Sequence, residues 1–168
     1  EEAKALIAQR VERYAIPCNL KWGYLMPAPK ARQMAALADE LEQMEALGYG
    51  RARLVPSGEV RHYVDSNAYQ GALYDNGAGH LEPLAYARGL ALAAESAGAR
   101  IFERSSAIRI ESGSCPAVVT ARGKISANAV VIAGNAYVGD LLPELLTHMQ
   151  PVSTFMLATA PMGAARAR

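Results

Sequence analysis

The stretch GHLEPLAYARGLALAAESAG, residues 79–98, decides the fold class of this 168-residue chain. Pro83 suits the first turn of a helix, and Gly98 suits the left-handed residue that ends one. Between them, one side of the predicted helix carries apolar and mostly small residues: Leu84, Ala87, Ala91 and Ala94. Because alanine side chains are short, this helix can approach a neighbouring sheet closely, as helices of α/β folds do.

Two helices and two strands are predicted upstream of this stretch. Apolar residues at helical spacing indicate a helix over 3–14 and a second helix from Pro29 to Gly48. Residues 18–26 and 51–56 are expected to be extended, the first because it is rich in aromatic and aliphatic side chains. The second helix carries one apolar stripe, which is typical of core packing: Met34, Leu37, Ala38, Leu41 and Met44.

The middle of the chain combines a short helix, a strand and a turn. Residues 57–64 favour a brief helical turn, and the run from Tyr69 to Tyr74 favours a strand. The sequence Asp75-Asn76-Gly77 has turn chemistry, so it is expected to end that strand. Side chains alternate along a regular strand, which would place the two tyrosines on opposite faces.

After Gly98 the pattern changes to short extended runs. Four strands are predicted, over 100–102, 107–111, 117–120 and 129–132. The last begins AVVIAGNAY, residues 129–137, where a continuous apolar run is followed by Gly134 and Asn135. Such a run suits a strand buried on both faces, and small residues at its end let the backbone approach a ligand. An ordinary buried strand would look the same. Together these elements predict an α/β fold with an attached β-meander.

Composition and charge limit the partners. The net charge of +1 argues against a nucleic-acid surface. The densest basic group, Arg51, Arg53, Arg61 and His62, is interpreted as a solvated surface.

Cys18 and Cys115 lie far apart in sequence, which favours free thiols in the cytoplasm. No apolar run approaches the roughly 20 residues of a membrane span. The chain begins without Met, so its numbering is expected to start inside a longer protein.

Known catalytic and cofactor motifs give little direct help. The dinucleotide fingerprint GxGxxG is missing from the sequence, and the glycines at 134 and 139 lack the lysine of a P-loop. The three histidines do not have the spacing of a metal site, so no metal is expected. His80 follows a Gly-rich link and precedes a helix, a location that favours ligand contact, although a local capping role would suit it equally.

Two longer runs carry a family resemblance. YQGALYDNGAGHLEPLAYARGLALAAESAGARIFERSSAIRIES (residues 69–112), followed by VVIAGNAYVGDLLPEL (130–145), resembles the D-amino-acid oxidase superfamily of FAD-dependent oxidoreductases. Within it, the resemblance is strongest to the branch that includes gamma-glutamylputrescine oxidase. It extends over nearly the whole chain and is most specific from Tyr69 to Pro143.

The resemblance implies a domain organisation. Residues 1–75 would be a portion of an inserted substrate domain with an antiparallel sheet, and residues 76–143 would be a portion of the FAD-binding domain. Residues 144–168 would return toward the substrate domain, with a strand over 152–158 and a tail that is expected to be disordered. The chain would therefore be an internal fragment of its parent enzyme.

The resemblance also implies site residues. The strand at 106–108 would contact the adenine of FAD, the turn at 133–135 would lie near its phosphate and ribityl groups, and residues 79–80 would lie near the flavin. The implied residues are Ile108, Ala133, Gly134, Asn135, Gly79 and His80 for FAD, and Tyr69 and Tyr74 for the substrate.

The implied reaction is oxidation of a C–N bond in a small amine or amino acid, such as a gamma-glutamylputrescine-like substrate, by hydride transfer to the flavin. Because the phosphate-binding fingerprint is missing, the chain alone is expected to be inactive and to bind FAD poorly. Two alternatives stay open. One is a non-catalytic binding module that retains part of the fold. The other is a flavoprotein acting on a sarcosine-like, amino-acid or modified-tRNA substrate, the last disfavoured by the near-neutral charge.

Overall fold

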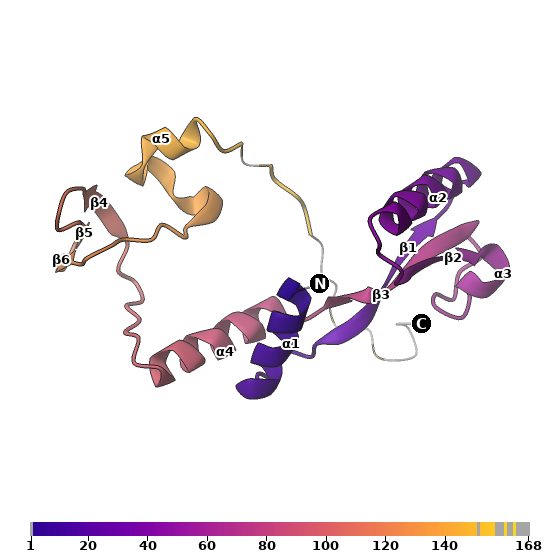
Figure 1. Ribbon diagram of the computed structural model, residues 1–168, viewed down its shortest axis with the longest axis horizontal. Helices are drawn as coiled ribbons and strands as arrows, with labels where there is room; N and C mark the ends of the chain where they lie inside the picture. Colours follow the sequence, from indigo (N-terminus) through magenta and orange to yellow (C-terminus); the bar gives the residue numbers. More distant parts are fainter. Residues whose placement is uncertain (1, 151, 157–159, 161–162, 164–168) are drawn as a thin grey trace. The chain divides into compact units, whose positions relative to one another are not determined.

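The computed structural model describes residues 2–150, 152–156, 160 and 163. The chain divides into two compact units between Arg100 and Ile101, and each unit has its own three-stranded antiparallel sheet (Figure 1). The predicted domain boundary after residue 75 falls inside a continuous strand of the first unit. None of the described helices is long and apolar enough to cross a membrane.

The first unit is built on the sheet β1-β3-β2 (Figure 1). Its strands are β1 (Lys21–Ala28), β2 (Ala52–Pro56) and β3 (Gly71–His80), and both pairings are antiparallel. Leu73 of the central strand is fully buried and pairs with a residue on each side: Met26 and Leu54. The strand predicted over 18–26 therefore starts and ends later than expected.

Two helices cover opposite faces of this sheet. α2 (Ala31–Ala46) packs against the face of Gly71, where a side chain would overlap with Met34. α3 (Ser57–Val60) is shorter than predicted and covers the other face, where Val60 packs with Ala72. Adjacent residues of a strand point to opposite faces, which explains how β3 serves both helices.

The end of α2 matches the prediction, and its beginning does not. Gly48 has φ +79° and its N–H donates to the Glu45 carbonyl, while the Tyr49 N–H donates to the Met44 carbonyl. This pair of hydrogen bonds is a Schellman motif, which needs the left-handed residue that glycine provides. The helix begins at Ala31, so Pro29 precedes it.

α4 (Pro83–Ser96) has the predicted bounds, with Pro83 in its first turn and Gly98 beyond its end at φ +92°. It contacts the segment after α1 (Glu2–Arg13). Ile16 of that segment is buried and lies against Gly89, where a side chain would overlap with it. The predicted close packing of the α4 alanine side on a sheet is not observed, since Leu84 on that side is 64% exposed.

The predicted turn at Asp75-Asn76-Gly77 is wrong as a chain reversal, because β3 continues to His80. The local chemistry is nevertheless present: Asp75 Oδ1 accepts hydrogen bonds from the N–H groups of Gly77 (2.8 Å) and Ala78 (3.2 Å). At this point the register between β3 and β1 shifts, opposite Trp22 and Tyr24. The side chain of Asp75 therefore produces a bulge within the strand instead of a turn.

The second unit contains the predicted meander (Figure 1). β4 (Ala107–Glu111) and β5 (Ala117–Thr120) have the predicted bounds, and β6 (Gly123–Ser126) completes the sheet. After it come the short helices η1 (Asn135–Tyr137), η2 (Gly139–Leu141) and α5 (Pro143–Leu146).

Two other strands predicted after Gly98 are wrong. Residues 100–102 and 129–132 form no strand, and Val131 is 87% exposed. An apolar run becomes a buried strand only where flanking strands satisfy its backbone, and the described residues place no strand beside it. Residues 152–156 are not extended into a strand either, while residues 157–158 and the predicted disordered tail at 164–168 lie outside the described residues.

Candidate functional site

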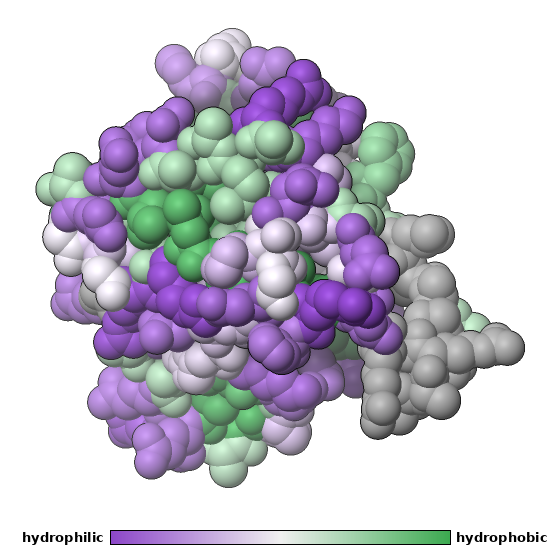
Figure 2. Space-filling model, turned by 90° about the vertical axis from the view of Figure 1, so that its right-hand side faces the viewer, coloured by the Kyte–Doolittle hydropathy of each residue, from purple (hydrophilic) through white to green (hydrophobic). Residues whose placement is uncertain are grey.

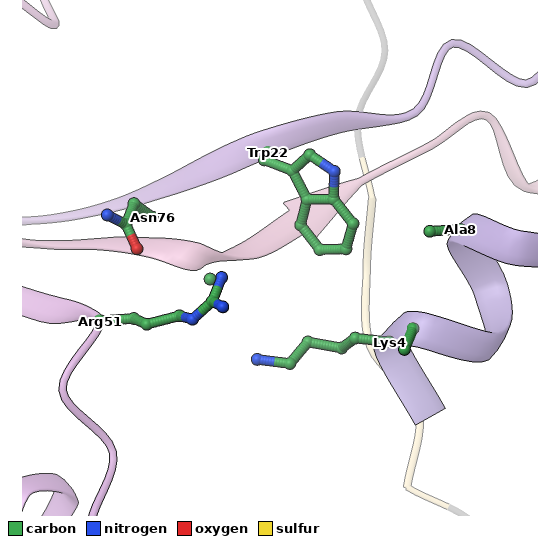
Figure 3. A pocket seen from close by; sticks show the side chains of 7 residues that line it. Lys4, Ala8, Trp22, Arg51 and Asn76 are labelled. Atoms are coloured by element: carbon green, nitrogen blue, oxygen red, sulfur yellow. The ribbon is translucent and has the colours of Figure 1, made fainter. Parts of the chain in front are cut away.

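A hollow of about 450 Å³ lies in the first unit, between the first helix and the sheet (Figure 3). Lys4 and two alanines of α1 form one side of it. Trp22 of β1 lies over it, and Arg51, just before β2, reaches in from the opposite side. The β3 bulge completes the wall. The full lining is Lys4, Ala5, Ala8, Trp22, Arg51, Asn76 and Gly77.

The β3 bulge determines the shape of this hollow. The Asn76 N–H donates to the Arg51 carbonyl (3.1 Å), which holds the start of β2 against the bulge. A side chain at Gly77 would lie 2.5 Å from the Arg51 Cδ and would overlap with the Tyr49 hydroxyl. Glycine at this position therefore lets the Arg51 and Tyr49 side chains approach the strand.

Behind the hollow lies a hydrogen-bonded chain of three side chains. The Tyr49 hydroxyl donates to the Asp75 carboxylate, at 2.7 Å from Oδ1 and 3.0 Å from Oδ2, and accepts from the Lys4 ammonium at 3.3 Å. Desolvation and the hydrogen bond to Asp75 together raise the pKa of Tyr49 above its ordinary value of 10. The tyrosine is therefore held in its neutral, donating form.

The lining of the hollow contains two cationic side chains, Lys4 and Arg51, and no acidic residue. The other basic residues of the predicted solvated group have partners nearby: Arg53 is 3.5 Å from Glu59, and Arg61 is 3.6 Å from Asp65. No ion pair of Arg51 occurs among the described residues.

A second hollow of the same unit contains two of the predicted site residues, Gly79 and His80. Its lining is Lys4, Ile7, Leu20, Trp22, Gly79, His80 and Leu81. A side chain at Gly79 would lie 2.8 Å from the Trp22 ring, so glycine allows this ring to lie against β3. The two hollows share Lys4 and Trp22 as walls and are neighbours.

The two predicted substrate tyrosines occupy a different place. Tyr69 precedes β3, and both Tyr69 and Tyr74 pack against the core cluster of Val55, Val60 and Ala72. Tyr69 lies outside the regular strand, so the placement on opposite faces expected for a regular strand does not apply to this pair. The Tyr74 ring also lies 5.0 Å from that of Tyr63.

In the second unit, a hollow of about 400 Å³ brings together two segments that the family resemblance pairs. Ala133 and Gly134 line it on one side, and Ser106 and Ala107 line it on the other. Ile108 and Asn135 are not part of this lining, and the Ile108 side chain is 62% exposed. Apolar residues such as Ile110 and Val118 fill the remaining wall, which suits a flat aromatic ring such as adenine.

These observations agree with the family comparison. The family described as "DAO: FAD dependent oxidoreductase" matches residues 1–168. The chain belongs to this family. The match confirms the resemblance predicted from the sequence and the cofactor, FAD, that it implied.

Relatives in the DAO family cover nearly all of the chain. "Gamma-glutamylputrescine oxidoreductase" of Escherichia coli strain K12 is 36% identical over 159 residues, which are 94% of this chain and 37% of that protein. "Probable oxidoreductase OrdL" of Haemophilus influenzae is 36% identical over 167 residues, 95% of this chain and 38% of its own length. The chain thus spans less than two fifths of these relatives.

Solved DAO-family structures confirm the mixed fold of helices and antiparallel sheet. The glycine oxidase from Geobacillus kaustophilus has a TM-score of 0.72 and 28% identity, and the match covers 82% of this chain and 38% of that one. The L-proline dehydrogenase from P. horikoshii also has a TM-score of 0.72, at 20% identity, with coverage of 83% and 38%.

Sequence reasoning missed the residues of the first hollow. Arg51 was grouped with solvated basic residues, and Asp75 and Asn76 were assigned to a turn. Trp22 is the one tryptophan of the sequence, and this is the signal that could have drawn attention to it. In the structure it pairs with Gly79, next to the β3 bulge. The contribution of Lys4 depends on how α1 meets the sheet, which no local pattern encodes.

Proposed function

We propose that the protein oxidises a C–N bond of a small amine or amino acid, and that its substrate is gamma-glutamylputrescine-like. The observation that carries this proposal is the 36% identity, over 94% of the chain, to a protein named gamma-glutamylputrescine oxidoreductase. The glycine oxidase at 28% identity supports the broader class of amine and amino-acid substrates. A non-catalytic module is not favoured, because these relatives are named as oxidoreductases, oxidases and dehydrogenases.

FAD, when bound, would supply the redox chemistry as the acceptor of a hydride from the carbon beside the amine, and water would hydrolyse the resulting imine to a carbonyl compound and a released amine. In this proposal the chain's own residues bind and orient the cofactor and the substrate. The hollow lined by Ala107, Ala133 and Gly134 is proposed to hold part of the FAD. The strand of Ile108 would face the adenine, and the turn of Gly134 and Asn135 would face the phosphate and ribityl groups.

Gly79 and His80 are proposed to lie on the flavin side of the first unit. The His80 imidazole lines a hollow next to the Trp22 ring, where a neutral ring nitrogen can accept a hydrogen bond from a substrate amine. Tyr69 and Tyr74 stay proposed substrate-side residues, although their packing on the Val55 cluster favours a supporting role beneath the site.

The remaining assignments are proposals of the same kind. Residues 1–75 and 144–168 are assigned to the substrate domain, and residues 76–143 to the FAD domain. A cytoplasmic location is supported by two free cysteines, Cys18 and Cys115.

The test is a panel of amines supplied to the protein expressed at its natural length. The panel contains gamma-glutamylputrescine, putrescine, glycine and sarcosine, and the carbonyl product is measured by derivatisation with a hydrazine. We expect gamma-glutamylputrescine to give the highest kcat/KM. Turnover of glycine alone would contradict the proposed substrate but keep the reaction class, and no turnover of any amine would contradict the reaction class.

A further inference from the structure

The hollow between α1 and the β3 bulge brings two cationic side chains from distant parts of the sequence to one space. Figure 3 shows the Lys4 ammonium and the Arg51 guanidinium both pointing into it, beside the Trp22 ring. An anion bound in this space would be attracted by both charges. The hollow therefore has the electrostatics of an anion site.

The hydrogen-bonding groups of the hollow indicate what kind of anion fits. A guanidinium presents parallel N–H donors that match the two oxygens of a carboxylate, and an ammonium adds a point charge. The Asn76 side-chain amide also lines the space, and rotation about its last bond would present its N–H₂ group as a further donor. Arg51 has no ion pair among the described residues, whereas Arg53 of the same segment is paired with Glu59.

The apolar part of the lining indicates what the anion is attached to. Trp22, Ala5 and Ala8 form a wall beside the two cations, which suits a short aliphatic chain. An inorganic oxyanion such as phosphate would gain nothing from this wall. The wall continues into the neighbouring hollow through Trp22, and that hollow contains His80.

We propose that Arg51, Lys4 and Asn76 form a binding site for a carboxylate on the substrate, at the end distant from the amine that is oxidised. This inference rests on the proposed amine oxidation and adds a specificity site to it. A gamma-glutamyl group keeps a free α-carboxylate, so a gamma-glutamylated diamine carries the required charge at the required end. The aliphatic chain lies along Trp22, and the amine reaches the hollow of His80.

The experiment compares one substrate that has a carboxylate, gamma-glutamylputrescine, with one that has none, N-acetylputrescine. The protein at its natural length is used as wild type, Arg51→Gln and Lys4→Gln. Arg32→Gln is the matched control, because Arg32 is exposed on α2 outside both hollows and loses the same charge. Thermal unfolding of each variant checks that it is folded. If Arg51→Gln does not fold, Arg51→Lys is the conservative replacement.

Loss of one charged hydrogen-bonding partner is expected to raise KM for gamma-glutamylputrescine about 10- to 100-fold, with a small change in kcat. KM for N-acetylputrescine stays within about twofold of the wild-type value, and Arg32→Gln changes neither. Arg51→Lys keeps the positive charge but loses the parallel N–H donors of the guanidinium, so it gives an intermediate KM for gamma-glutamylputrescine. Equal losses on both substrates, or a retained preference in Arg51→Gln, would overturn the carboxylate site.

Binding of glutarate, a simple dicarboxylate, separates this inference from the proposed reaction. Glutarate is titrated calorimetrically into the wild type, Arg51→Gln and Arg32→Gln, and inorganic phosphate is titrated as a second probe. Glutarate binding that weakens at least tenfold in Arg51→Gln alone supports the site even if no amine is oxidised. Binding of phosphate as strong as that of glutarate, or glutarate binding unchanged by Arg51→Gln, would contradict it.

Discussion

The Tyr49 hydroxyl donates a hydrogen bond to Asp75, 2.7 Å from Oδ1, and so joins the segment that follows α2 to the middle of β3. Asp75 is buried, with 9% of its surface exposed, and the same carboxylate accepts from the backbone at Gly77. One buried acid thus holds both the strand bulge and the helix end. Figure 2 shows one face of the molecule, on which apolar side chains form patches bordered by polar side chains.

Replacing Tyr49 by Phe removes a donor from this carboxylate. We expect the free energy of unfolding to fall by about 1–2 kcal/mol, because a charged acceptor loses a partner while two backbone donors remain. Urea denaturation measures the change. Tyr24→Phe is the control, since Tyr24 is 52% exposed. Equal stability of Tyr49→Phe and the wild type would mean that water replaces the hydroxyl without cost.

The same hydroxyl predicts a dependence on alkaline pH. Desolvation first, and the hydrogen bond to Asp75 second, raise the pKa of Tyr49 above 10. A raised folded-state pKa means that the stabilisation is fully present below pH 10 and is lost as the pH rises through the folded value. The stability advantage of the wild type over Tyr49→Phe should therefore shrink above about pH 10. An advantage that is constant to about pH 11 would contradict this assignment.

The pKa of a carboxylate in the second unit, Glu111, shifts in the opposite direction. The hydrogen bond from Lys124, followed by that from Arg109, lowers the pKa of Glu111 below its ordinary value of 4.5. Its contribution to stability is therefore present above pH 4.5 and is lost as the pH falls through the folded value. NMR titration of the Glu111 carboxyl should show a rise of its pKa in Lys124→Gln and in high salt, which screens exposed pairs. Arg122→Gln should leave it unchanged, and a similar rise in that control would indicate a general charge effect.

Gly89 should respond to alanine in the opposite way to most helical glycines. Alanine in a helix interior usually stabilises by roughly 0.5–1 kcal/mol. At Gly89 the added methyl group would overlap with the buried Ile16, so we expect a loss of about 1–3 kcal/mol. Thermal unfolding of Gly58→Ala provides the comparison, because no heavy atom lies within 4 Å of that position. Rescue of Gly89→Ala by Ile16→Ala would locate the overlap, and additive losses would show that it lies elsewhere.

Elements whose partners lie close in sequence were predictable. β4 and β5 pair with each other through a short connection, and α2 and α4 end at glycines that local rules identify, Gly48 and Gly98. The strand predicted at 129–132 depends on flanking strands that no local pattern supplies, and there the prediction failed. A bulge and a turn share the chemistry of Asp75, so sequence alone favoured the commoner outcome.

The candidate site divides in the same way. The family resemblance, together with the local pattern at His80 and Gly134, pointed to Gly79, His80, Ala133 and Gly134. Each of them lines a hollow, and their contact with FAD stays a prediction. Arg51 was not recognised, because its role comes from the tertiary approach of α1 and β1, which brings Lys4 and Trp22 beside it.

The 168-residue chain alone should bind FAD weakly. Its sequence lacks the GxGxxG fingerprint, whose turn and helix N-terminus hold the pyrophosphate. After incubation with FAD and gel filtration, the purified chain should show little flavin absorbance. A stoichiometric yellow complex at neutral pH would contradict this prediction.

The central claim, FAD-dependent oxidation of an amine, is tested most directly by a half-reaction. The protein at its natural length is purified with its flavin and mixed with gamma-glutamylputrescine in the absence of oxygen. The claim predicts that the oxidised flavin absorbance is lost as the amine is consumed, with one carbonyl product formed for each flavin reduced. A colourless protein, or a flavin that no amine or amino acid reduces, would contradict it.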